Sequence, residues 1–306
     1  MRNILLVGLG NLGMRYVEGL MNIKFDISID IIEPIKANYE MLAASKGINN
    51  NILRHININS VKSDYDLCIV ATPSVPRAQI IKEICSETLI RAWVIEKVLA
   101  TSIEDLKIIQ VAIGDSPAWV NNTRRLTRLY KTLQSKLLDE PLKLKVIQKD
   151  FALGCNSIHY IDAISWLSGE PLDSIFVESK SLWFDSKRIG YKEFNGTVMA
   201  KTTRGSKLLI DNTGKYEDDE IILCQGENIA RINEGKGFVW NNNVIATGRL
   251  EYQSELTAPL VEQIILNGNC SLPTLKASCL QHAMMLKAIF QDPMLSQNEE
   301  RYIPIT

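Results

Sequence analysis

The most constraining feature of this 306-residue chain is a glycine run that follows its first hydrophobic segment. Residues 3–7 are predicted to form a strand, and Gly8-Leu9-Gly10-Asn11-Leu12-Gly13 then leads into a helix-like stretch over residues 12–21. A G-x-G-x-x-G run between a strand and a helix is typical of a turn that binds a dinucleotide pyrophosphate. One glycine makes the tight turn, one lets the backbone approach the phosphates, and one lets the helix pack against the strand. The N-terminal amides of the helix then face the anion.

A carboxylate follows at the spacing that such a turn requires. Glu33 ends the second predicted strand, 20 residues after Gly13, where a carboxylate accepts hydrogen bonds from the ribose hydroxyls of NAD. A 2′-phosphate beside Glu33 would be repelled, so we expect NAD rather than NADP; Lys36, three residues later, keeps NADP as the less favoured alternative. The predicted cofactor-binding residues of this region are Gly8, Gly10, Asn11, Leu12, Gly13 and Glu33.

The first 121 residues alternate short β-branched runs with amphipathic stretches, a rhythm that predicts an α/β domain with a doubly wound parallel sheet. The expected strands are residues 3–7, 27–32, 52–56, 67–71, 93–96 and 119–122. The expected helices are residues 12–21, 35–45, 75–85 and 103–112. We therefore predict a Rossmann dinucleotide-binding domain over residues 1–121.

From residue 122 the pattern predicts an α+β domain built on a mostly antiparallel sheet. The expected helices are residues 126–138, 158–167, 256–266 and 275–290. The expected strands are residues 142–147, 174–179, 197–203, 207–211, 220–224, 228–233 and 238–241. We expect residues 122–306 to bind the substrate and to mediate oligomerisation.

Composition excludes several classes of function. Lysine plus arginine number 34 and aspartate plus glutamate number 35, so no overall field draws the chain to nucleic acid or anionic lipid. The apolar runs are far shorter than a membrane span, and the N-terminus lacks the features of a signal peptide. The six cysteines show no C-x-x-C spacing, which favours reduced thiols over disulfides or a zinc site. We expect a cytoplasmic protein that binds neither nucleic acid nor membrane and holds no metal.

Two dipeptides follow predicted strands at the sheet edge where open α/β sheets bind ligands. Thr72-Pro73 follows the fourth strand, and Glu96-Lys97 follows the fifth. We predict that all four residues contact the cofactor. A lysine at this edge is also suited to hold a substrate oxygen while hydride leaves the carbon, although it can equally be a solvated loop residue.

The histidines are few, and proton transfer at neutral pH most often uses one. His55 and His282 lie in a predicted strand and in the last predicted helix, where a structural role is expected. His159 and Asp162 lie three residues apart and so share a helix face. From the residues alone, His159 is either a structural histidine or a proton-transfer group.

Five motifs occur in a fixed order along the chain: the glycine turn, Thr72-Pro73, Glu96-Lys97, the run Asn122-Thr123-Arg124-Arg125, and the run from Ser157 to Asp162. In this order they resemble the glucose-fructose oxidoreductase, inositol dehydrogenase and MocA (Gfo/Idh/MocA) family over essentially the whole chain. The resemblance implies an NAD(P)-dependent oxidoreductase that acts on sugars, cyclitols or nucleotide-linked sugars. It also implies association through the sheet of the second domain, as a homodimer or homotetramer.

The resemblance assigns catalytic roles to three residues. Lys97 matches the lysine of the family's Glu-Lys-Pro motif, His159 the histidine of its G-x-H-x-x-D helix, and Asp162 the aspartate one turn later. Val98 replaces the proline of the first motif, so we expect any special backbone geometry there to be lost. Cys155 stands where sugar-oxidising members carry an aspartate.

Further residues are candidates for the substrate site. Arg124 and Arg125 follow the sixth strand and, with Arg77, suggest that an acidic group of the substrate is held, although ion pairs within the protein are an equal alternative. Cys155 sits where a helix dipole favours a thiolate. The predicted substrate-binding residues are Arg124, Arg125, Cys155, Asn156 and His159.

The sequence therefore predicts an oxidoreductase that transfers hydride between nicotinamide and a carbinol or carbonyl carbon of a sugar-like substrate. The departures at Val98 and Cys155 leave two alternatives open. One is a dinucleotide-binding sensor or accessory protein without turnover. The other is a reductase of a C=N bond or a non-sugar carbonyl on the same scaffold.

Overall fold

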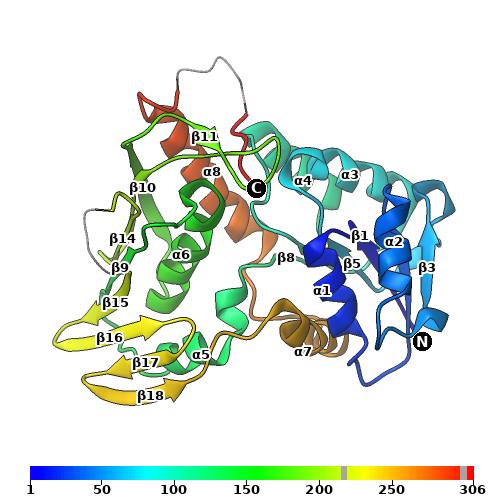
Figure 1. Ribbon diagram of the computed structural model, residues 1–306, viewed down its shortest axis with the longest axis horizontal. Helices are drawn as coiled ribbons and strands as arrows, with labels where there is room; N and C mark the ends of the chain where they lie inside the picture. The colour runs from blue at the N-terminus through cyan, green and yellow to red at the C-terminus, as the bar shows by residue number, and fades with distance from the viewer. Residues whose placement is uncertain (215–218, 297–301) are drawn as a thin grey trace. The chain divides into compact units, whose positions relative to one another are not determined.

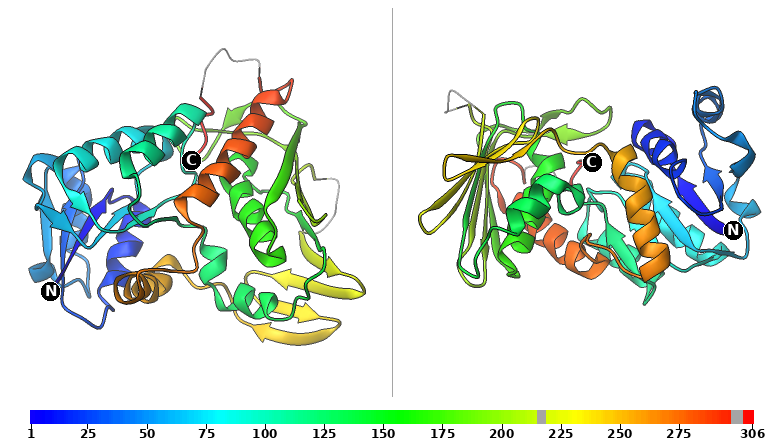
Figure 2. Two further views of the ribbon diagram at one scale, coloured as in Figure 1. Left: turned by 180° about the vertical axis from the view of Figure 1, so that it is seen from behind. Right: turned by 90° about the horizontal axis from the view of Figure 1, so that it is seen from below.

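The computed structural model describes residues 1–214, 219–296 and 302–306, which divide into two compact units. The first unit comprises Met1–Ala100, Glu104–Asn121 and Glu251–Ser278, and the second comprises Thr101–Ile103, Asn122–Leu250 and Cys279–Thr306. Figures 1 and 2 trace the chain through both units. Residues 251–278 thus belong to the first unit, although they follow most of the second unit in the sequence. A single boundary near residue 121 does not describe this return.

The first unit is built on a parallel sheet, as the sequence predicted. Among the described residues, six strands join in the order β3-β2-β1-β5-β7-β8, the arrangement of a doubly wound dinucleotide-binding fold. These strands are β1 (Arg2–Val7), β2 (Ile27–Ile32), β3 (Leu53–Ile56), β5 (Leu67–Val70), β7 (Trp93–Ile95) and β8 (Ala118–Val120). The short strands β4 (Asp64–Tyr65) and β6 (Leu89–Ile90) pair with each other. The central strands are almost entirely buried, as expected of a parallel sheet covered on both faces.

The helices of this unit are α1 (Asn11–Leu20), α2 (Lys36–Ala43), α3 (Ser74–Glu87), most of α4 (Ile103–Ile113) and α7 (Gln253–Asn267). Short 3₁₀ turns η1 (Asn50–Ile52) and η2 (Ile58–Ser60) flank β3. Helix α7 packs directly on α1, where a Cβ on Gly19 would lie 2.5 Å from Cβ of Thr257. A larger residue at position 19 would therefore push the two helices apart.

The second unit is built on a mixed sheet. Among the described residues it has eight strands in the order β10-β13-β14-β9-β15-β16-β17-β18, of which only the β14–β9 pair is parallel. The mostly antiparallel sheet predicted from the sequence is thus confirmed. The strands are β9 (Lys143–Ile147), β10 (Leu172–Ser179), β13 (Gly196–Thr202), β14 (Lys207–Asp211), β15 (Glu220–Gln225), β16 (Asn228–Asn233), β17 (Gly237–Trp240) and β18 (Asn243–Thr247). A separate hairpin pairs β11 (Phe184–Asp185) with β12 (Lys192–Glu193).

The helical elements of this unit are η3 (Thr123–Leu126), α5 (Arg128–Gln134), α6 (Leu153–Ser168) and most of α8 (Leu275–Gln291). Helix α6 packs on β13 and β14, and the ribbon of Figure 2 shows α6 and α8 on the same face of the large sheet. Alternate residues of the strands are buried beneath α6, such as Val198 and Leu208, whereas Phe176 and Lys201 on the opposite face are exposed. One face of the sheet therefore forms the core of the unit, and the other is open in the part of the chain that the structure describes.

Candidate active site

The candidate residues of the first unit lie along one edge of the parallel sheet. The strand register aligns Val7 with Ile32 on one side and with Val70 on the other. It continues from Val70 to Ile95 and from Ile95 to Val120. The residues that follow these five positions therefore emerge side by side at the carboxyl ends of the strands, where α/β sheets bind ligands. They include Gly8, Glu33, Thr72, Glu96 with Lys97, and Asn121.

Each glycine of the turn meets a different steric requirement. Gly8 has φ +92°, which disfavours a side chain, and a Cβ on Gly13 would lie only 2.2 Å from the carbonyl oxygen of Gly8. A Cβ on Gly10, in contrast, would meet nothing within 4 Å. Gly10 is the N-cap of α1, and no side chain caps that helix. The space beside Gly10 and the uncapped amides of α1 thus fit a diphosphate, with Asn11 and Leu12 in the first turn.

Glu33 is fixed between two loops. Its Oε2 accepts a hydrogen bond from the backbone amide of Leu9 at 2.6 Å, and its Oε1 accepts one from Ile35 at 2.9 Å. The carboxylate is nearly buried and belongs to the loop after β2. Since a carboxylate has about four acceptor positions, each oxygen keeps capacity for a ribose hydroxyl. This placement fits the role that the sequence predicted for Glu33.

The Thr72-Pro73 loop begins α3, with Pro73 as the N-cap. Arg77 on the same helix is buried and donates to the backbone carbonyls of Thr72, Glu96 and Val98. Arg77 therefore joins the loops after β5 and β7. The suggestion that it helps to hold an acidic substrate was wrong, because its guanidinium is turned inward onto these carbonyls.

Glu96 is the centre of a buried hydrogen-bond network. Its Oε1 accepts from the hydroxyl of Tyr16 on α1 at 2.5 Å and from Nδ2 of Asn121 at 2.6 Å. Burial raises the pKa of this carboxyl above its ordinary value, and the hydrogen bonds from Tyr16 and Asn121 oppose that rise. The half-buried Lys97 comes next, and the Lys97–Val98 peptide bond is cis, although the sequence led us to expect no special geometry without the proline. Glu96 thus anchors the loop that carries Lys97.

The sequence interpretation missed Asn121. This side chain is 2% exposed, and its Nδ2 also donates to Oε1 of Gln253, on α7, at 2.8 Å. Two features hold it in place: a carboxylate 25 residues earlier and an amide 132 residues later. A local sequence pattern contains no signal for such a distant arrangement.

The candidate residues of the second unit gather on η3 and α6. Arg125 donates to Asp162 through both Nε and Nη2, at 2.7 and 2.6 Å, and Gln281 adds a hydrogen bond to Asp162 at 3.1 Å. Asp162 is 1% exposed, so burial raises the pKa of its carboxyl, while Arg125 acts to lower it. Asp162 therefore fixes η3 against α6.

Arg124 has a carboxylate partner of its own. Its Nε and Nη2 lie 2.8 and 3.0 Å from the two carboxylate oxygens of Glu234, and its guanidinium stacks 4.0 Å from the ring centre of Tyr160. Tyr130 donates to the same Glu234 carboxylate at 2.7 Å. Both arginines predicted to bind substrate thus form ion pairs within the unit, which reduces what they can offer to an external anion.

Helix α6 begins at Leu153, five residues before the predicted start. The amides of Gly154 and Cys155 donate to the carboxylate of Glu193 on β12 at 2.7 and 3.1 Å. A carboxylate therefore already occupies the positive end of the helix, which leaves less of the helix dipole to act on Cys155. His159 is half-buried and lies one turn farther along the helix than Cys155.

A cavity of about 830 Å³ opens at the N-terminal end of α6. Its lining combines the aromatic side chains of Phe151 and Tyr191 with the polar groups of Asn156 and Glu193, and it includes Cys155. Positive and negative side chains are mixed around it, with Lys149 and Lys187 among several carboxylates. Its volume is that of a small-molecule site.

The structure thus brings the cofactor candidates together in the first unit and the substrate candidates together in the second. In the ranges that it describes, no group of three or more histidine, cysteine or acidic residues is arranged to hold a metal ion. Nor does any helix in these ranges have the length and apolar character needed to cross a membrane. All six cysteines are free thiols.

Comparisons with solved structures identify the fold. UDP-N-acetylglucosamine 3-dehydrogenase GnnA from Acidithiobacillus ferrooxidans superposes with a TM-score of 0.73 at 11% identity, over 97% of this chain and 99% of that one. Scyllo-inositol dehydrogenase from Lactobacillus casei, with bound NAD(H) and scyllo-inositol, gives 0.67 at 17% identity, over 94% and 95% of the two chains. An oxidoreductase from Agrobacterium radiobacter, in complex with NAD⁺, L-tartaric acid and magnesium, gives 0.70 at 14% identity, over 97% and 96%.

No protein-family model matches the chain, and no curated protein matches it in sequence. The structural likeness extends over both units, so the chain has the fold of these oxidoreductases. The resemblance to the Gfo/Idh/MocA fold, inferred from five short motifs, is confirmed at the level of the fold.

Proposed function

We propose that this chain is an NAD-dependent oxidoreductase that transfers hydride between nicotinamide and a carbinol or carbonyl carbon of a sugar-like substrate. The main support is the carboxyl edge of the parallel sheet. It combines the open space at Gly10, the uncapped amides of α1, the fixed carboxylate of Glu33 and the anchored Lys97. The oxidoreductases of the same fold include one with bound NAD(H) and one in complex with NAD⁺.

The residues of this chain have separate tasks in the proposed reaction. When bound, NAD(H) supplies the hydride chemistry. Lys97 holds the substrate oxygen through its ammonium group, and His159 takes or gives the hydroxyl proton. Asp162 and Arg125 keep the helix that bears His159 in place. Thr72, Pro73 and Glu96 shape the loops around the cofactor.

The cavity at the start of α6, whose lining ends one turn before His159, supports a polyhydroxylated substrate. The faces of Phe151 and Tyr191 suit the C–H surface of a sugar ring, and Asn156 and Glu193 suit hydroxyl groups. The lining mixes cationic and anionic side chains, so its charge does not choose between a neutral and an anionic sugar-like ligand. A sugar, a sugar acid or a nucleotide-linked sugar remains our proposed substrate, with Cys155 as a contact in place of the family's aspartate.

Substitution of the two reactive groups tests the catalytic assignment. We expect Lys97→Ala and His159→Ala each to lower kcat by about 100-fold or more while NADH affinity is nearly unchanged. Lys82→Ala, which removes an exposed lysine on α3, is the matched control and should behave as the parent does. Parent rates in both active-site variants would refute the assignment.

Cofactor binding is tested by thermal unfolding with NAD⁺, NADH, NADP⁺ and NADPH. A ligand at about 100 times its Kd adds roughly 2.7 kcal/mol to stability, which raises Tm by several degrees. We expect a clear shift with NADH and little with NADPH. If none of the four shifts Tm, absorbance of the supernatant after denaturation, near 260 and 340 nm, tells whether a nucleotide was already bound.

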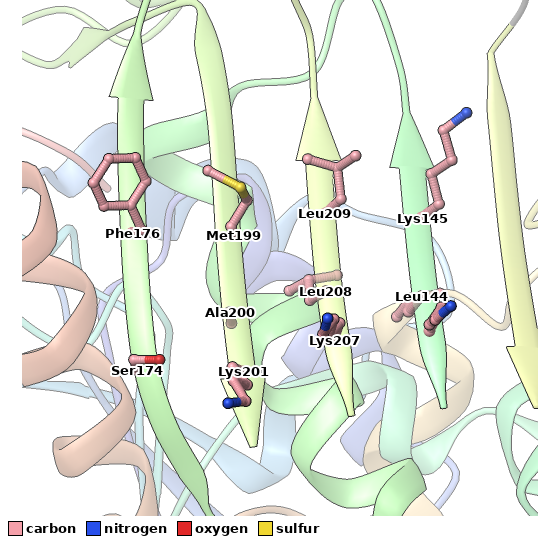
Figure 3. Close-up of a pocket in the computed structure, with 11 residues that line it drawn as sticks. Leu144, Lys145, Ser174, Phe176, Met199, Ala200, Lys201, Lys207, Leu208 and Leu209 are labelled. Atoms are coloured by element: carbon pink, nitrogen blue, oxygen red, sulfur yellow. The ribbon is translucent and has the colours of Figure 1, made fainter. Parts of the chain in front are cut away.

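The open face of the large sheet supports self-association. Figure 3 shows Phe176, Met199, Leu209 and Lys145 on neighbouring strands of this face. Phe176 is 59% exposed, and an exposed apolar row across neighbouring strands typically marks an interface. We infer a homodimer or homotetramer through this sheet, and Phe176→Glu should reduce the mass measured by light scattering.

The other interpretations make different predictions. Cofactor binding without turnover of any sugar, sugar acid or nucleotide sugar would indicate a sensor or accessory protein. Cys155, which stands in place of the family's aspartate, is the residue that motivates this alternative. Activity with imines or enones alone would indicate a C=N or non-sugar C=O reductase. For all three functions we propose a cytoplasmic location, in accord with the free cysteines.

A further inference from the structure

Two buried side-chain oxygens of the first unit, both at the carboxyl edge of the parallel sheet, have no hydrogen-bond partner among the described residues. They are Oγ1 of Thr72, after β5, and Oδ1 of Asn121, after β8. Leaving a buried polar atom unsatisfied costs about 1 to 3 kcal/mol, so native proteins rarely retain one without a reason. An absent ligand that supplies the missing partner is such a reason.

The orientation of Asn121 shows what kind of partner fits. Its Nδ2 lies between two acceptors, the carboxylate of Glu96 at 2.6 Å and Oε1 of Gln253 at 2.8 Å. Turning the amide over would place an oxygen against both acceptors, so the nitrogen must occupy this side. The remaining Oδ1 is an acceptor only, and it needs an N–H or O–H donor from a ligand.

Sheet order places Asn121 toward one end of the proposed cofactor site. Glu33 follows β2, the glycine turn follows β1, and Asn121 follows β8 at the opposite edge of the sheet. A dinucleotide with its adenosine ribose at Glu33 and its diphosphate at the turn extends its other half toward β5, β7 and β8. That half ends in a carboxamide, whose NH2 group is a donor.

We propose that Asn121 is a specificity residue for the nicotinamide, whose carboxamide NH2 donates to its Oδ1. Glu96 and Gln253 act as positioning residues, because they fix the amide in the acceptor orientation. This inference rests on the proposed NAD site and adds the residue that distinguishes the carboxamide from other groups at the same position.

Equilibrium binding by calorimetry tests the proposal with three ligands. NAD⁺ carries the carboxamide, 3-acetylpyridine adenine dinucleotide replaces its NH2 with a methyl group, and ADP-ribose lacks the ring altogether. We expect the parent protein to bind NAD⁺ about tenfold or more tightly than the acetylpyridine analogue. In Asn121→Ala the two affinities should become equal, while the Kd for ADP-ribose stays within about twofold of the parent value.

Two further variants keep the test decisive. Gln253→Ala leaves Asn121 in place but removes one of its two anchors, so the preference for NAD⁺ should fall without disappearing. Thr88→Val removes another buried hydroxyl without a partner, at the C-terminal end of α3, and should change no affinity.

Equal binding of NAD⁺ and its analogue by the parent protein would overturn the inference. So would an equal loss of all three ligands in Asn121→Ala, because that result indicates damage to the whole pocket. If the parent protein binds neither NAD⁺ nor ADP-ribose, the proposed cofactor site itself is wrong.

Discussion

Asp162→Asn should destabilise the protein far more than the same substitution at Asp139, an exposed carboxylate whose ion pair has the same N–O distance. Asp162 is 1% exposed and its partner Arg125 has a side chain that is 15% exposed, with the closest contact at 2.6 Å. Removing one member of a buried pair costs about 3 to 5 kcal/mol, because the other charge is left in a medium that solvates it poorly. Two effects reduce the loss: Arg125 is partly exposed, and burial raises the pKa of the Asp162 carboxyl. The expected loss therefore lies near the lower limit, at about 3 kcal/mol.

Thermal unfolding followed by circular dichroism or calorimetry measures this effect. For a domain of this size, 1 kcal/mol shifts Tm by about 2 to 4 °C, so Asp162→Asn should unfold about 6 to 12 °C earlier. The matched control is Asp139→Asn, whose partner Arg204 also lies at 2.6 Å but whose own side chain is 83% exposed. No measurable shift is expected for the control, because exposed ion pairs contribute little.

A double variant separates the buried pair from the packing around it. When Arg125→Met and Asp162→Leu are combined, no unpaired charge remains, and most of the lost stability should return. The reasoning fails if Asp162→Asn shifts Tm no more than Asp139→Asn does. It also fails if the double variant is as unstable as the sum of its two single variants.

Three other perturbations follow from the first unit. Gly13→Ala should lower the free energy of unfolding by about 1 to 3 kcal/mol, because its Cβ would meet the carbonyl of Gly8; Tm measures this loss. Gly10→Ala should unfold like the parent protein but bind NADH more weakly, which calorimetry measures. Burial acts to raise the pKa of Asp30, but hydrogen bonds from Arg54 and Tyr65 lower it below its ordinary value. Asp30→Asn should therefore be less stable than the parent protein at pH 7. The difference in stability should shrink below about pH 4, because the carboxyl of the unfolded parent is protonated there. Unfolding curves measured across this pH range test the expectation. Glu33→Ala should weaken NADH binding and reduce the ratio of NADH affinity to NADPH affinity. Unchanged affinities for both cofactors would contradict the proposed ribose contact.

The sequence was sufficient for features that local pattern determines. Short β-branched runs that alternate with amphipathic stretches predicted the six strands of the first sheet. The glycine spacing predicted the start of α1 to within one residue. Helix α6 was predicted five residues short, because its first turn contains Gly154 and Asn156, which are poor helix formers. That turn is held by Glu193, which lies 38 or 39 residues farther along the chain. No local pattern reveals such a cap.

Contacts between distant residues account for the other differences. Arg77 was expected near the substrate because its charge suggested an anion, yet burial turns it onto backbone carbonyls. Arg124 pairs with Glu234, 110 residues later in the turn between β16 and β17, and Arg125 pairs with Asp162, 37 residues later on α6. The two-residue strands β11 and β12 carry too few residues to be predicted from an alternating pattern.

The return of α7 to the first unit has a consequence for biosynthesis. The surface of α1 that α7 covers includes Gly19, and α7 ends about 150 residues after β8. At about 5 to 20 residues per second, the ribosome needs roughly 7 to 30 s to add that stretch. Throughout this interval the first unit of the nascent chain leaves exposed the face of α1 that α7 later covers. A shortened gene that stops at residue 121 would leave that face uncovered permanently, and we expect its product to aggregate.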